Sequence, residues 1–575
     1  MEAYFTDTSI RKAIQVNVNH NKISMEEKAM KVKETITLPQ LTNDIVRQAR
    51  KTKLCAYSVA LEGWRRGLKL KWYTKDSEHF QNMVIFGVNP PGRLFSLSSE
   101  SETHYFFRTR GDKVPSETVE IAQEKDDAKI YMEKAGVPVP KGRGFGVETL
   151  DEEIIGYSRS LGFPLVLKPT DGSLGAGVMT DINSEQELME ALVYVRQELE
   201  YGAVVVEQYV VGKEYRVYVV DDQVIAAYNR VPANITGDGE HTISELIQLK
   251  NDERRKNARL YSCLIEIDKE ILDFIYAVGY TFESIPEAGE KIFLRQKTNV
   301  SSGGDPIDVT DKLPEEIGKI AINALKSIPG LYHGGVDIIV NEGNVSKETA
   351  VVIELNPTAQ IGGALYPLKG KSRNIPGAII DFYFPETKGI DTSKSKIYFD
   401  LNTVLEPLQN RSAIETEVAP APLGTLYARK YIVSGKGVQR QNYREWLKNR
   451  AIDKGLSGFI KKISSEEIEV IVAGTSKVEI NNFKNRLSRN NNRAEVKRVK
   501  ESVYKQPVKL GFEISQHYRF SSLKSVETAY KRMEKDLYDM KKQMNKVVKE
   551  NKKIENSRSW KVSSSLRKLG SLSKK

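Results

Sequence analysis

Two carboxylates and an amide interrupt otherwise apolar segments of this sequence. Asp337 lies inside GGVDIIV, and Glu354 and Asn356 end the run AVVIELNP. Side chains two residues apart in a strand point to the same face, so Glu354 and Asn356 are expected to lie together. A carboxylate among Val and Ile is costly unless a cation or a metal compensates for it, which disfavours a solvated surface. Three oxygen side chains in one place suit Mg²⁺, with Mn²⁺ as the alternative ion.

A lysine followed by glycines precedes these segments, in FPLVLKPTDGSLGAGV. Lys168 ends the apolar run, and Gly172, Gly175 and Gly177 follow it. Glycines let backbone N–H groups come close to phosphate oxygens, and a lysine at the end of the strand adds a positive charge beside them. Glycine-rich loops are common, so this segment alone is equally compatible with an ordinary loop.

A third segment, VVVEQYVVGKEYRVYVV, predicts two strands joined by a short linker. The first strand ends at Glu207, the linker crosses Gly212, and the second strand begins with Glu214 and Arg216. The backbone that leaves the first strand can bond an adenine edge, and a carboxylate beyond it can accept bonds from ribose hydroxyl groups. A charged hairpin with an exposed Glu and Arg is the alternative.

Alternating helices and strands must position these segments. YSVALEGWRRGLKLKWYT predicts a helix that stops near Gly67 and then a strand, and NMVIFGV predicts a buried strand before the turn at residues 90–92. Residues 122–140 predict an amphipathic helix that ends at Gly136. Strands, glycine loops and helices then alternate to about residue 385, which indicates the α/β or α+β class. For the whole chain we expect α+β.

The order Lys, glycine-rich loop, Glu, Glu-x-Arg and Asp…Glu-x-Asn resembles the ATP-grasp superfamily. Within it, the sequence is most similar to cyanophycin synthetases and to the ATP-grasp half of bifunctional glutathione synthetases. The segments that narrow the resemblance are AQEKDDAKIYMEKAGVPVP, RVPANITGDGEHTISELIQLKN and LRQKTNVSSGGDPIDVTD. The resemblance covers about 270 residues of the chain.

This resemblance implies roles for individual side chains. Lys125 and Lys168 would contact the nucleotide phosphates, and the loop with Gly172, Ser173, Gly175 and Gly177 would close over them. Glu207 and Val210 would hold the adenine edge, and Glu214 the ribose. Arg216, Arg230 and Arg295 would surround the γ-phosphate and the acyl group, and Asp337, Glu354 and Asn356 would hold Mg²⁺. Asn299 and His241 match motif positions near the substrate, although His241 could instead cap the turn GDGEH.

A second unit, residues 427–490, predicts strand, helix, strand, strand and helix, a split βαβ pattern of the ferredoxin-like kind. It resembles the acylphosphatase-like domain, and VQRQNYR lies where that family has a phosphate loop that ends in a catalytic arginine, here Arg444. Arg440 replaces a loop glycine, and Lys462 stands at the position of the asparagine that orients the attacking water. An ammonium group cannot accept that hydrogen bond, so an anion-binding or purely structural module is expected.

The end of the chain differs from the rest. From Ser521 to Lys575 there are 16 Lys and Arg against 6 Asp and Glu, so nearly all of the net charge of +11 lies there. Residues 523–554 carry apolar residues in alternating steps of three and four, which predicts a coiled coil and a homodimer. Cations alternate with apolar residues in the last segment. Contact with an anionic membrane and a solvated tail are equally compatible with it.

The composition is that of a multidomain globular protein without a disulfide framework. Its only cysteines, Cys55 and Cys263, are far apart, and no apolar run reaches the length of a membrane span. We therefore expect a cytoplasmic protein that does not bind nucleic acid, with peripheral contact at the inner face of the membrane as an open question. The expected units are residues 1–50, poorly defined; 51–118, an α/β subdomain; 119–390, ATP-grasp; 425–490, acylphosphatase-like; 521–556, coiled coil; and 557–575, a basic tail.

The function that these features favour is an ATP-dependent carboxylate–amine ligase that works through an acylphosphate. The amino-acid acceptor would be a peptide or a cell-envelope polymer. Two alternatives remain open. One is a hydrolase in which the acylphosphatase-like domain does the chemistry, and the other is an ATP-binding scaffold dimerised by its coiled coil. The missing asparagine disfavours the hydrolase, and the costly buried carboxylates disfavour the scaffold.

Overall fold

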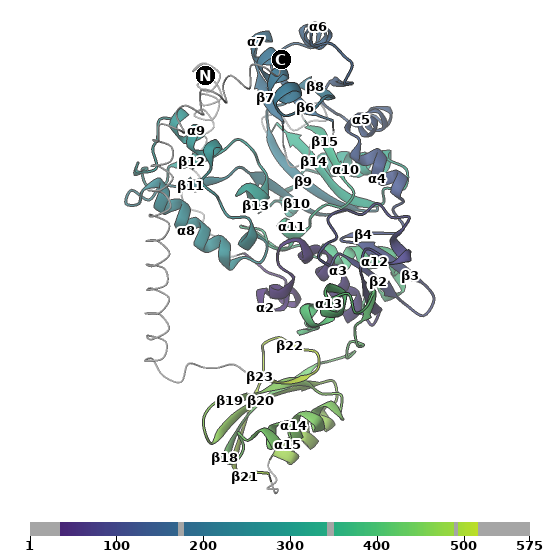
Figure 1. Ribbon diagram of the computed structural model, residues 1–575, viewed down its shortest axis with the longest axis vertical. Coiled ribbons are helices and arrows are strands. Elements are labelled where there is room, and N and C mark those ends of the chain that lie inside the picture. The colour runs from purple at the N-terminus through teal and green to yellow at the C-terminus, as the bar shows by residue number, and fades with distance from the viewer. Residues whose placement is uncertain (1–34, 171–176, 342–349, 488–492, 516–575) are drawn as a thin grey trace, which may run out of the picture.

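The computed structural model describes residues 35–170, 177–341, 350–487 and 493–515 (Figure 1). Helices and mostly antiparallel sheets are mixed along these ranges, which confirms the α+β class. None of the helices described combines the length and apolar character that a membrane span needs. The predicted coiled coil at 521–556 and the basic tail at 557–575 lie outside the described residues.

An antiparallel five-stranded sheet forms the N-terminal unit. Its order is β17 (Glu415–Glu417), β1 (Lys69–Tyr73), β2 (Leu94–Ser98), β3 (Thr103–Phe107) and β4 (Arg110–Gly111). Helix α3 (Leu54–Arg65) is buried along its whole length and packs against β2 and α12 (Ile375–Tyr383), while α13 (Leu401–Gln409) packs near β17. The chain turns after α3 at Gly67, whose φ of +94° favours glycine. Strand β17 pairs with β1 although more than 300 residues of chain separate them, at Lys71–Glu417, for example.

Two sequence expectations for this unit are corrected by the structure. Residues 82–88 form no strand, because their polar groups bond side chains: the Val84 N–H donates to Ser116 Oγ at 3.0 Å, and the Val84 carbonyl accepts from Arg110. Residues 35–50 were expected to be poorly defined. They include α2 (Asn43–Val46), whose Ile45 and Val46 are fully buried in the core of the unit.

The central sheet is antiparallel and is buried on both faces. Its order is β13 (Asp305–Asp308), β10 (Gln223–Val231), β9 (Lys213–Val220), β14 (His333–Val340) and β15 (Ala350–Asn356). Val217 and Val219 join the core that α10 (Glu315–Ser327), α4 (Ser116–Gln123) and α5 (Lys125–Lys134) cover. Tyr218 and Val220 join the core of the N-terminal unit, with α11 (Gly362–Leu365) nearby. Strand alternation therefore directs Arg216, on the Tyr218 face, toward the N-terminal unit.

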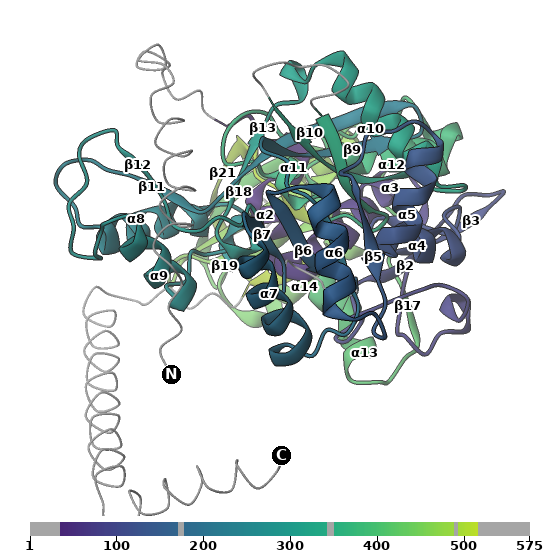
Figure 2. The same ribbon diagram turned by 90° about the horizontal axis from the view of Figure 1, so that it is seen from above.

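A smaller sheet has its own hydrophobic core. Its order is β5 (Gly142–Phe145), β8 (Val204–Gln208), β6 (Leu165–Pro169) and β7 (Met179–Ile182), with α6 (Asp151–Leu161) and α7 (Glu185–Leu192) packed against it. Figure 2 shows this lobe over the remaining chain when the molecule is seen from above. A separate core lets the lobe move as a body relative to the central sheet.

A third lobe, residues 232–300, projects to one side in Figure 2. It contains β11 (Asn234–Thr236), β12 (Lys291–Phe293), α8 (Ile243–Lys256) and α9 (Lys269–Ala277). Thr242 and Glu245 form a reciprocal capping box at the start of α8.

The C-terminal unit is a five-stranded sheet with two helices. Its order is β21 (Glu495–Val503), β18 (Tyr427–Lys436), β20 (Glu467–Gly474), β19 (Ser457–Lys462) and β23 (Phe512–Ser515), and its helices are α14 (Gln441–Ile452) and α15 (Lys477–Leu487). The unit extends beyond residue 490, the end that the sequence pattern predicts. The basic segment after it supplies β21, paired with β18, and β23, paired with β19. A parallel pair, β16 (Ile397–Tyr398) with β22 (Val508–Lys509), joins this unit to the rest.

Candidate active site

Two arginines clamp one carboxylate at the centre of the antiparallel sheet. Asp337 on β14 lies opposite Arg216 on β9, and the Arg216 guanidinium donates to both carboxylate oxygens, with Nη2 at 2.6 Å from Oδ2. Arg230 Nη1, from β10, lies 2.8 Å from Asp337 Oδ2 and 2.7 Å from Glu214 Oε1. Burial raises the pKa of Asp337, but the two arginines outweigh this effect and hold the pKa below its usual value.

Glu354 lies directly across from Asp337 in the β14–β15 pair, and Asn356 is two residues further on the same strand. The Glu354 side chain opens onto the cleft. The pKa of Glu354 is raised, first because nearby protein atoms displace water from its carboxylate and second because Asp337 carries a like charge. Asn356 Nδ2 is buried without a hydrogen-bond partner. Closely spaced carboxylates fit a dication, whereas the free Asn356 N–H fits an acceptor such as a phosphate oxygen. Among the residues that the structure describes, no group of three His, Cys, Asp or Glu could hold a metal ion.

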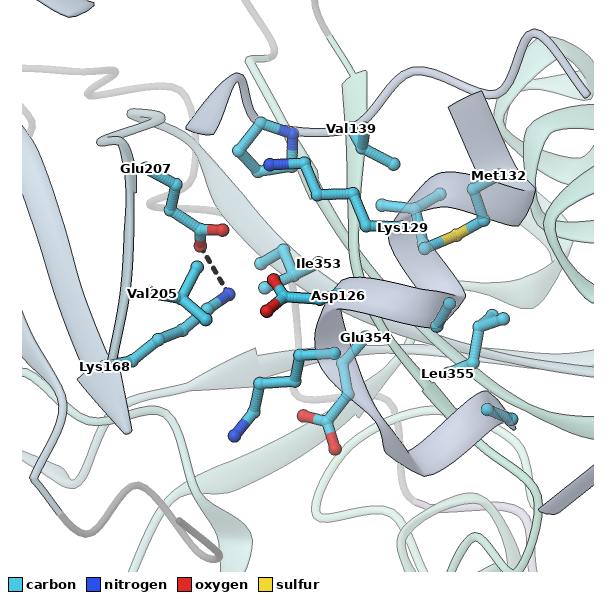
Figure 3. A pocket seen from close by; sticks show the side chains of 15 residues that line it. Asp126, Lys129, Met132, Val139, Lys168, Val205, Glu207, Ile353, Glu354 and Leu355 are labelled. Atoms are coloured by element: carbon cyan, nitrogen blue, oxygen red, sulfur yellow. Dashed lines mark hydrogen bonds and ion pairs between the residues drawn. The ribbon is translucent and has the colours of Figure 1, made fainter. Parts of the chain in front are cut away.

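The smaller lobe faces this sheet with a buried ion pair (Figure 3). Lys168 Nζ on β6 lies 2.6 Å from Glu207 Oε1 on β8, and both side chains are at most 10% exposed. Lys125 Nζ, at the start of α5, donates to the carbonyls of Pro169 and Thr170 at 2.9 and 3.0 Å. The cavity between α5, β6, β8 and β15 measures about 20 Å³, which holds about one water. As described, this cavity is therefore too small to hold a nucleotide.

Two further residues of α5, Asp126 and Lys129, line this cavity and are not among the predicted site residues. Both belong to the segment KDDAK, and Lys129 lies one helical turn after Lys125. Burial raises the pKa of Asp126 and lowers that of Lys129. Lys129 Nζ donates to the Gly142 carbonyl at 2.9 Å.

The predicted nucleotide loop is only partly described. Gly172, Ser173 and Gly175 lie outside the described residues. Gly177 has a φ of +69° and packs closely on the Pro169 ring. Val210 lies half-buried in the linker between β8 and β9.

Glu214 is held by protein groups in this structure. Arg230 pairs with it, and the Thr298 hydroxyl donates to its Oε2. Burial raises its pKa against the attraction of Arg230. Thr298 was absent from the sequence prediction, although it stands inside the segment RQKTNVSSGG next to Asn299, which precedes a short turn of helix at Val300–Ser302.

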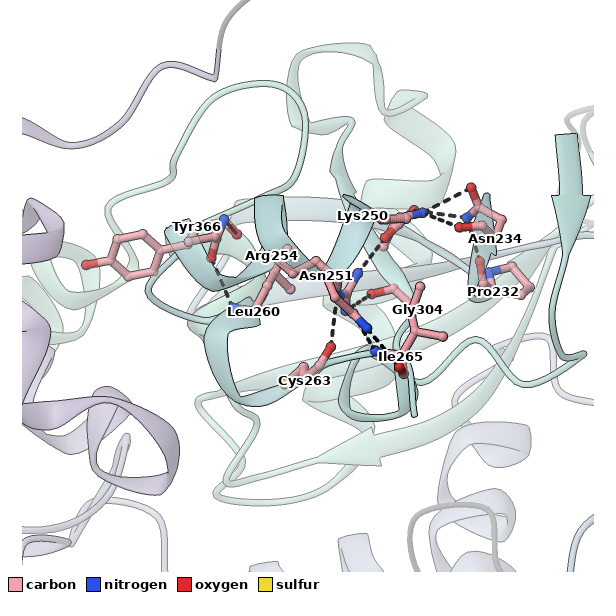
Figure 4. Close-up of polar contacts among 12 residues, drawn as sticks. Pro232, Asn234, Lys250, Asn251, Arg254, Leu260, Cys263, Ile265, Gly304 and Tyr366 are labelled. Carbon is pink, nitrogen blue, oxygen red and sulfur yellow. Dashed lines mark hydrogen bonds and ion pairs between the residues drawn. The ribbon is translucent and has the colours of Figure 1, made fainter. Parts of the chain in front are cut away.

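A buried network positions this segment (Figure 4). Arg254 on α8 donates to Asp305 Oδ1 at 2.7 Å and to the carbonyls of Cys263 and Gly304 at 2.8 and 3.1 Å. Lys250 Nζ lies 2.6 Å from Asp305 Oδ2. Helix α8 therefore fixes residues 304–305, just beyond Thr298.

Among the residues that the structure describes, neither Arg295 nor His241 contacts the cluster around Asp337. Arg295 is buried in the third lobe, 3.0 Å from both Asp268 Oδ2 and Glu270 Oε2. His241 is 42% exposed and bonds Asp238 through its backbone N–H and through Nδ1. The turn-capping alternative therefore describes His241 in this structure.

Arg444 belongs to a different region. It lies on α14 of the C-terminal unit, at the opposite end of the molecule from the smaller lobe in Figure 1. Its Nε is buried without a hydrogen-bond partner, and Lys462, at the end of β19, is exposed.

Known proteins match these regions of the chain. Residues 122–256 match the model of the RimK-like ATP-grasp domain, and residues 429–514 match that of acylphosphatase. The cyanophycin synthetase of Trichormus variabilis is 36% identical over 283 residues, 48% of this chain and 31% of that protein. The glutathione biosynthesis bifunctional protein GshAB of Clostridium perfringens is 30% identical over 298 residues, 51% of this chain and 38% of that protein. The chain spans about a third of the length of these curated relatives.

A solved structure is also similar. The crystal structure of a bifunctional glutathione synthetase from Pasteurella multocida has 27% sequence identity and a TM-score of 0.41, covering 51% of this chain and 40% of that one. The chain therefore contains a region that matches the RimK-like ATP-grasp domain and, after it, a region that matches acylphosphatase.

Proposed function

We propose that this chain is an ATP-dependent carboxylate–amine ligase that forms an acylphosphate intermediate. The observation that carries the proposal is the cluster of Arg216, Arg230, Asp337 and Glu354 on one sheet. Glu354 of this cluster lines the same cavity as Lys168 of the smaller lobe. Fixed cations that face a cleft stabilise the charge on a transferring phosphoryl group, where most of such catalysis lies.

The chemistry proceeds in two steps. A carboxylate oxygen of the first substrate attacks the γ-phosphorus of ATP, the bond to the β-phosphate oxygen breaks, and ADP leaves. The nitrogen of an amine then attacks the acyl carbon, inorganic phosphate leaves, and the nitrogen loses a proton to solvent. Arg216 and Arg230 would orient the phosphoryl and acyl oxygens, and Lys125 and Lys168 the other phosphates. Closure of the smaller lobe would exclude water from the acylphosphate.

Asp337, Glu354 and Asn356 would hold Mg²⁺, or Mn²⁺ in its place. Asp337 accepts one hydrogen bond at Oδ1 and two at Oδ2 from Arg216 and Arg230, so the second lone pair of Oδ1 could contact a cation. When bound, the ion neutralises phosphate charge and orients the γ-phosphate.

The test uses the full chain with ATP, Mg²⁺, panels of carboxylates and hydroxylamine as the trapping amine. A ligase of this kind releases ADP and yields a hydroxamate only when its carboxylate is present. Failure of the full chain to bind MgATP in calorimetry would contradict the proposal.

The substrates and assembly belong to the same proposal. The ligase would add an amino acid to a peptide or to a cell-envelope polymer; the relatives named as a cyanophycin synthetase and a glutathione biosynthesis protein support the ligase class only. The heptad pattern of residues 523–554 supports a homodimer, and the basic tail supports peripheral contact with an anionic membrane.

A further inference from the structure

Three cations meet at the N-terminal end of helix α3. Lys53 immediately precedes the helix, Arg93 begins the β2 hairpin, and Arg108 lies in the turn between β3 and β4. Arg93 Nη1 and Arg108 Nη2 both approach Gly87, at 3.3 and 4.0 Å from the position that a Cβ would take there. Lys53 Cδ similarly lies 3.1 Å from the Cβ position of Gly92, directly before Arg93. We call Lys53, Arg93 and Arg108 the cationic group.

No carboxylate pairs with the cationic group within the ranges that the structure describes. Arg93 is 8% exposed, and its Nε and Nη1 are buried without a hydrogen-bond partner, as is Arg108 Nε. Arg93 Nη2 donates to a neutral acceptor, Thr52 Oγ1, at 2.8 Å. Arg108 lies over the rings of Phe86 and Phe107, at 4.6 and 5.0 Å from their centroids. Burial and the neighbouring charge of Arg93 lower the pKa of Lys53.

Two other buried arginines of the same unit are compensated. Arg65 donates to the carbonyls of Gln40 and Ile397, and Arg66 pairs with Glu62 and Asp381. Arg110 donates to the Val84 carbonyl, but its Nε and Nη1 also lack hydrogen-bond partners. Because an uncompensated buried charge is costly, an external anion would stabilise the cationic group. The N-terminal end of α3 adds the positive end of a helix dipole, which also favours an anion.

A chain of contacts leads from the residue after Arg108 to Arg216 of the proposed phosphoryl-transfer site. Thr109, between Arg108 and β4, donates to the Ala359 carbonyl at 3.3 Å. The Ala359 and Arg216 side chains lie side by side over Gly335, at 2.8 and 2.9 Å from its Cβ position. Lys53 and Arg108 are only half-buried, so the group is open to a ligand from the surface.

We propose that Lys53, Arg93 and Arg108 bind a second anionic group of the carboxylate-bearing substrate, away from the carboxylate that is phosphorylated. The ligand is therefore a dicarboxylate or a phosphate-bearing acid. The identity of the ligand as a substrate rests on the proposed function, whereas anion binding itself does not.

The test is calorimetry on the full chain at constant ionic strength, with the nucleotide site filled by a non-hydrolysable ATP analogue and Mg²⁺. Tricarballylate and inorganic phosphate are the probes for the carboxylate and phosphate forms of the ligand. Arg108→Gln and Lys53→Gln are each expected to weaken binding by about ten-fold or more, because each removes a charge-assisted contact. Arg47→Gln is the matched control, since Arg47 lies in the same unit with a 75% exposed side chain.

A second readout separates ligand binding from misfolding. Because the three cations repel one another, Arg108→Gln without ligand is expected to melt at the same temperature as the wild type or higher. Binding of either probe by the wild type that is lost in both variants supports the site. Absence of binding of both probes, or equal affinity in the variants, overturns it. These outcomes differ from failure of the proposed function, which is a loss of MgATP binding.

Discussion

The buried pair of Lys168 and Glu207 allows stability and nucleotide binding to be separated. We predict that Lys168→Met destabilises the smaller lobe, whereas Lys168→Met/Glu207→Leu restores its stability without restoring affinity for MgATP. The pair joins β6 to β8 through a contact of 2.6 Å with both side chains at most 10% exposed. Removing one partner leaves an uncompensated buried charge, while removing both leaves an apolar pair of similar volume.

The expected magnitude follows from this burial. Breaking a buried pair by removing one partner costs about 3–5 kcal/mol, and an apolar replacement of both partners is close to neutral. Loss of a charge-assisted hydrogen bond to a phosphate costs about 1.5–3 kcal/mol, which weakens MgATP binding about ten-fold to a hundred-fold in both variants.

Hydrogen exchange on β6 and β8 measures the local stability, because the lobe has its own core and can open separately. A loss of 3 kcal/mol accelerates exchange on the order of a hundred-fold. Arg159→Gln is the control, since its ion pair with Glu185 lies in the same lobe but is 63% and 41% exposed. Unchanged exchange in Lys168→Met would refute the burial argument, and wild-type MgATP affinity in the double variant would refute the assignment of Lys168.

Four further predictions follow from named groups. Asp337→Asn and Glu354→Gln are each expected to slow Mg²⁺-dependent ADP formation about a hundred-fold or more, and wild-type turnover by both would exclude the metal assignment. The full chain should hydrolyse benzoyl phosphate no faster than its Arg444→Ala variant, and a clear difference would promote the hydrolase alternative. Deletion of residues 521–575 should convert a dimer to a monomer in analytical ultracentrifugation with activity retained; a dimeric truncation contradicts this. Burial lowers the pKa of His333 from 6.5 to about 4 in the folded protein. Between these two pH values the unfolded chain therefore binds a proton at His333 that the folded protein does not bind. The stability of the protein should therefore fall by about 2 kcal/mol from pH 7 to pH 5, but not in His333→Gln.

Local patterns in the sequence were sufficient for many of the elements. The apolar helix before Gly67 and the strand after it appear as α3 and β1. The strand, helix, strand, strand and helix of residues 427–490 appear in that order from β18 to α15. The strand predicted at residues 82–88 is absent, because an apolar run does not reveal whether a partner strand is available to pair with it. The sequence pattern also does not predict β21, because this exposed edge strand is basic and has few apolar residues to mark it as a strand.

The sequence by itself determined which residue types could do chemistry, because a Lys before glycines and carboxylates inside Val and Ile runs are visible in short windows. It also determined that Glu354 and Asn356 follow each other with the period of a strand. Only the tertiary structure decided that Arg216 and Arg230 hold Asp337, across 121 and 107 residues of chain. It likewise brought Lys53, Arg93 and Arg108 together from three segments that look ordinary in the sequence. The physical reason is that strand register and packing between units, rather than local periodicity, set the distances between charges, and those distances determine what the charges can bind.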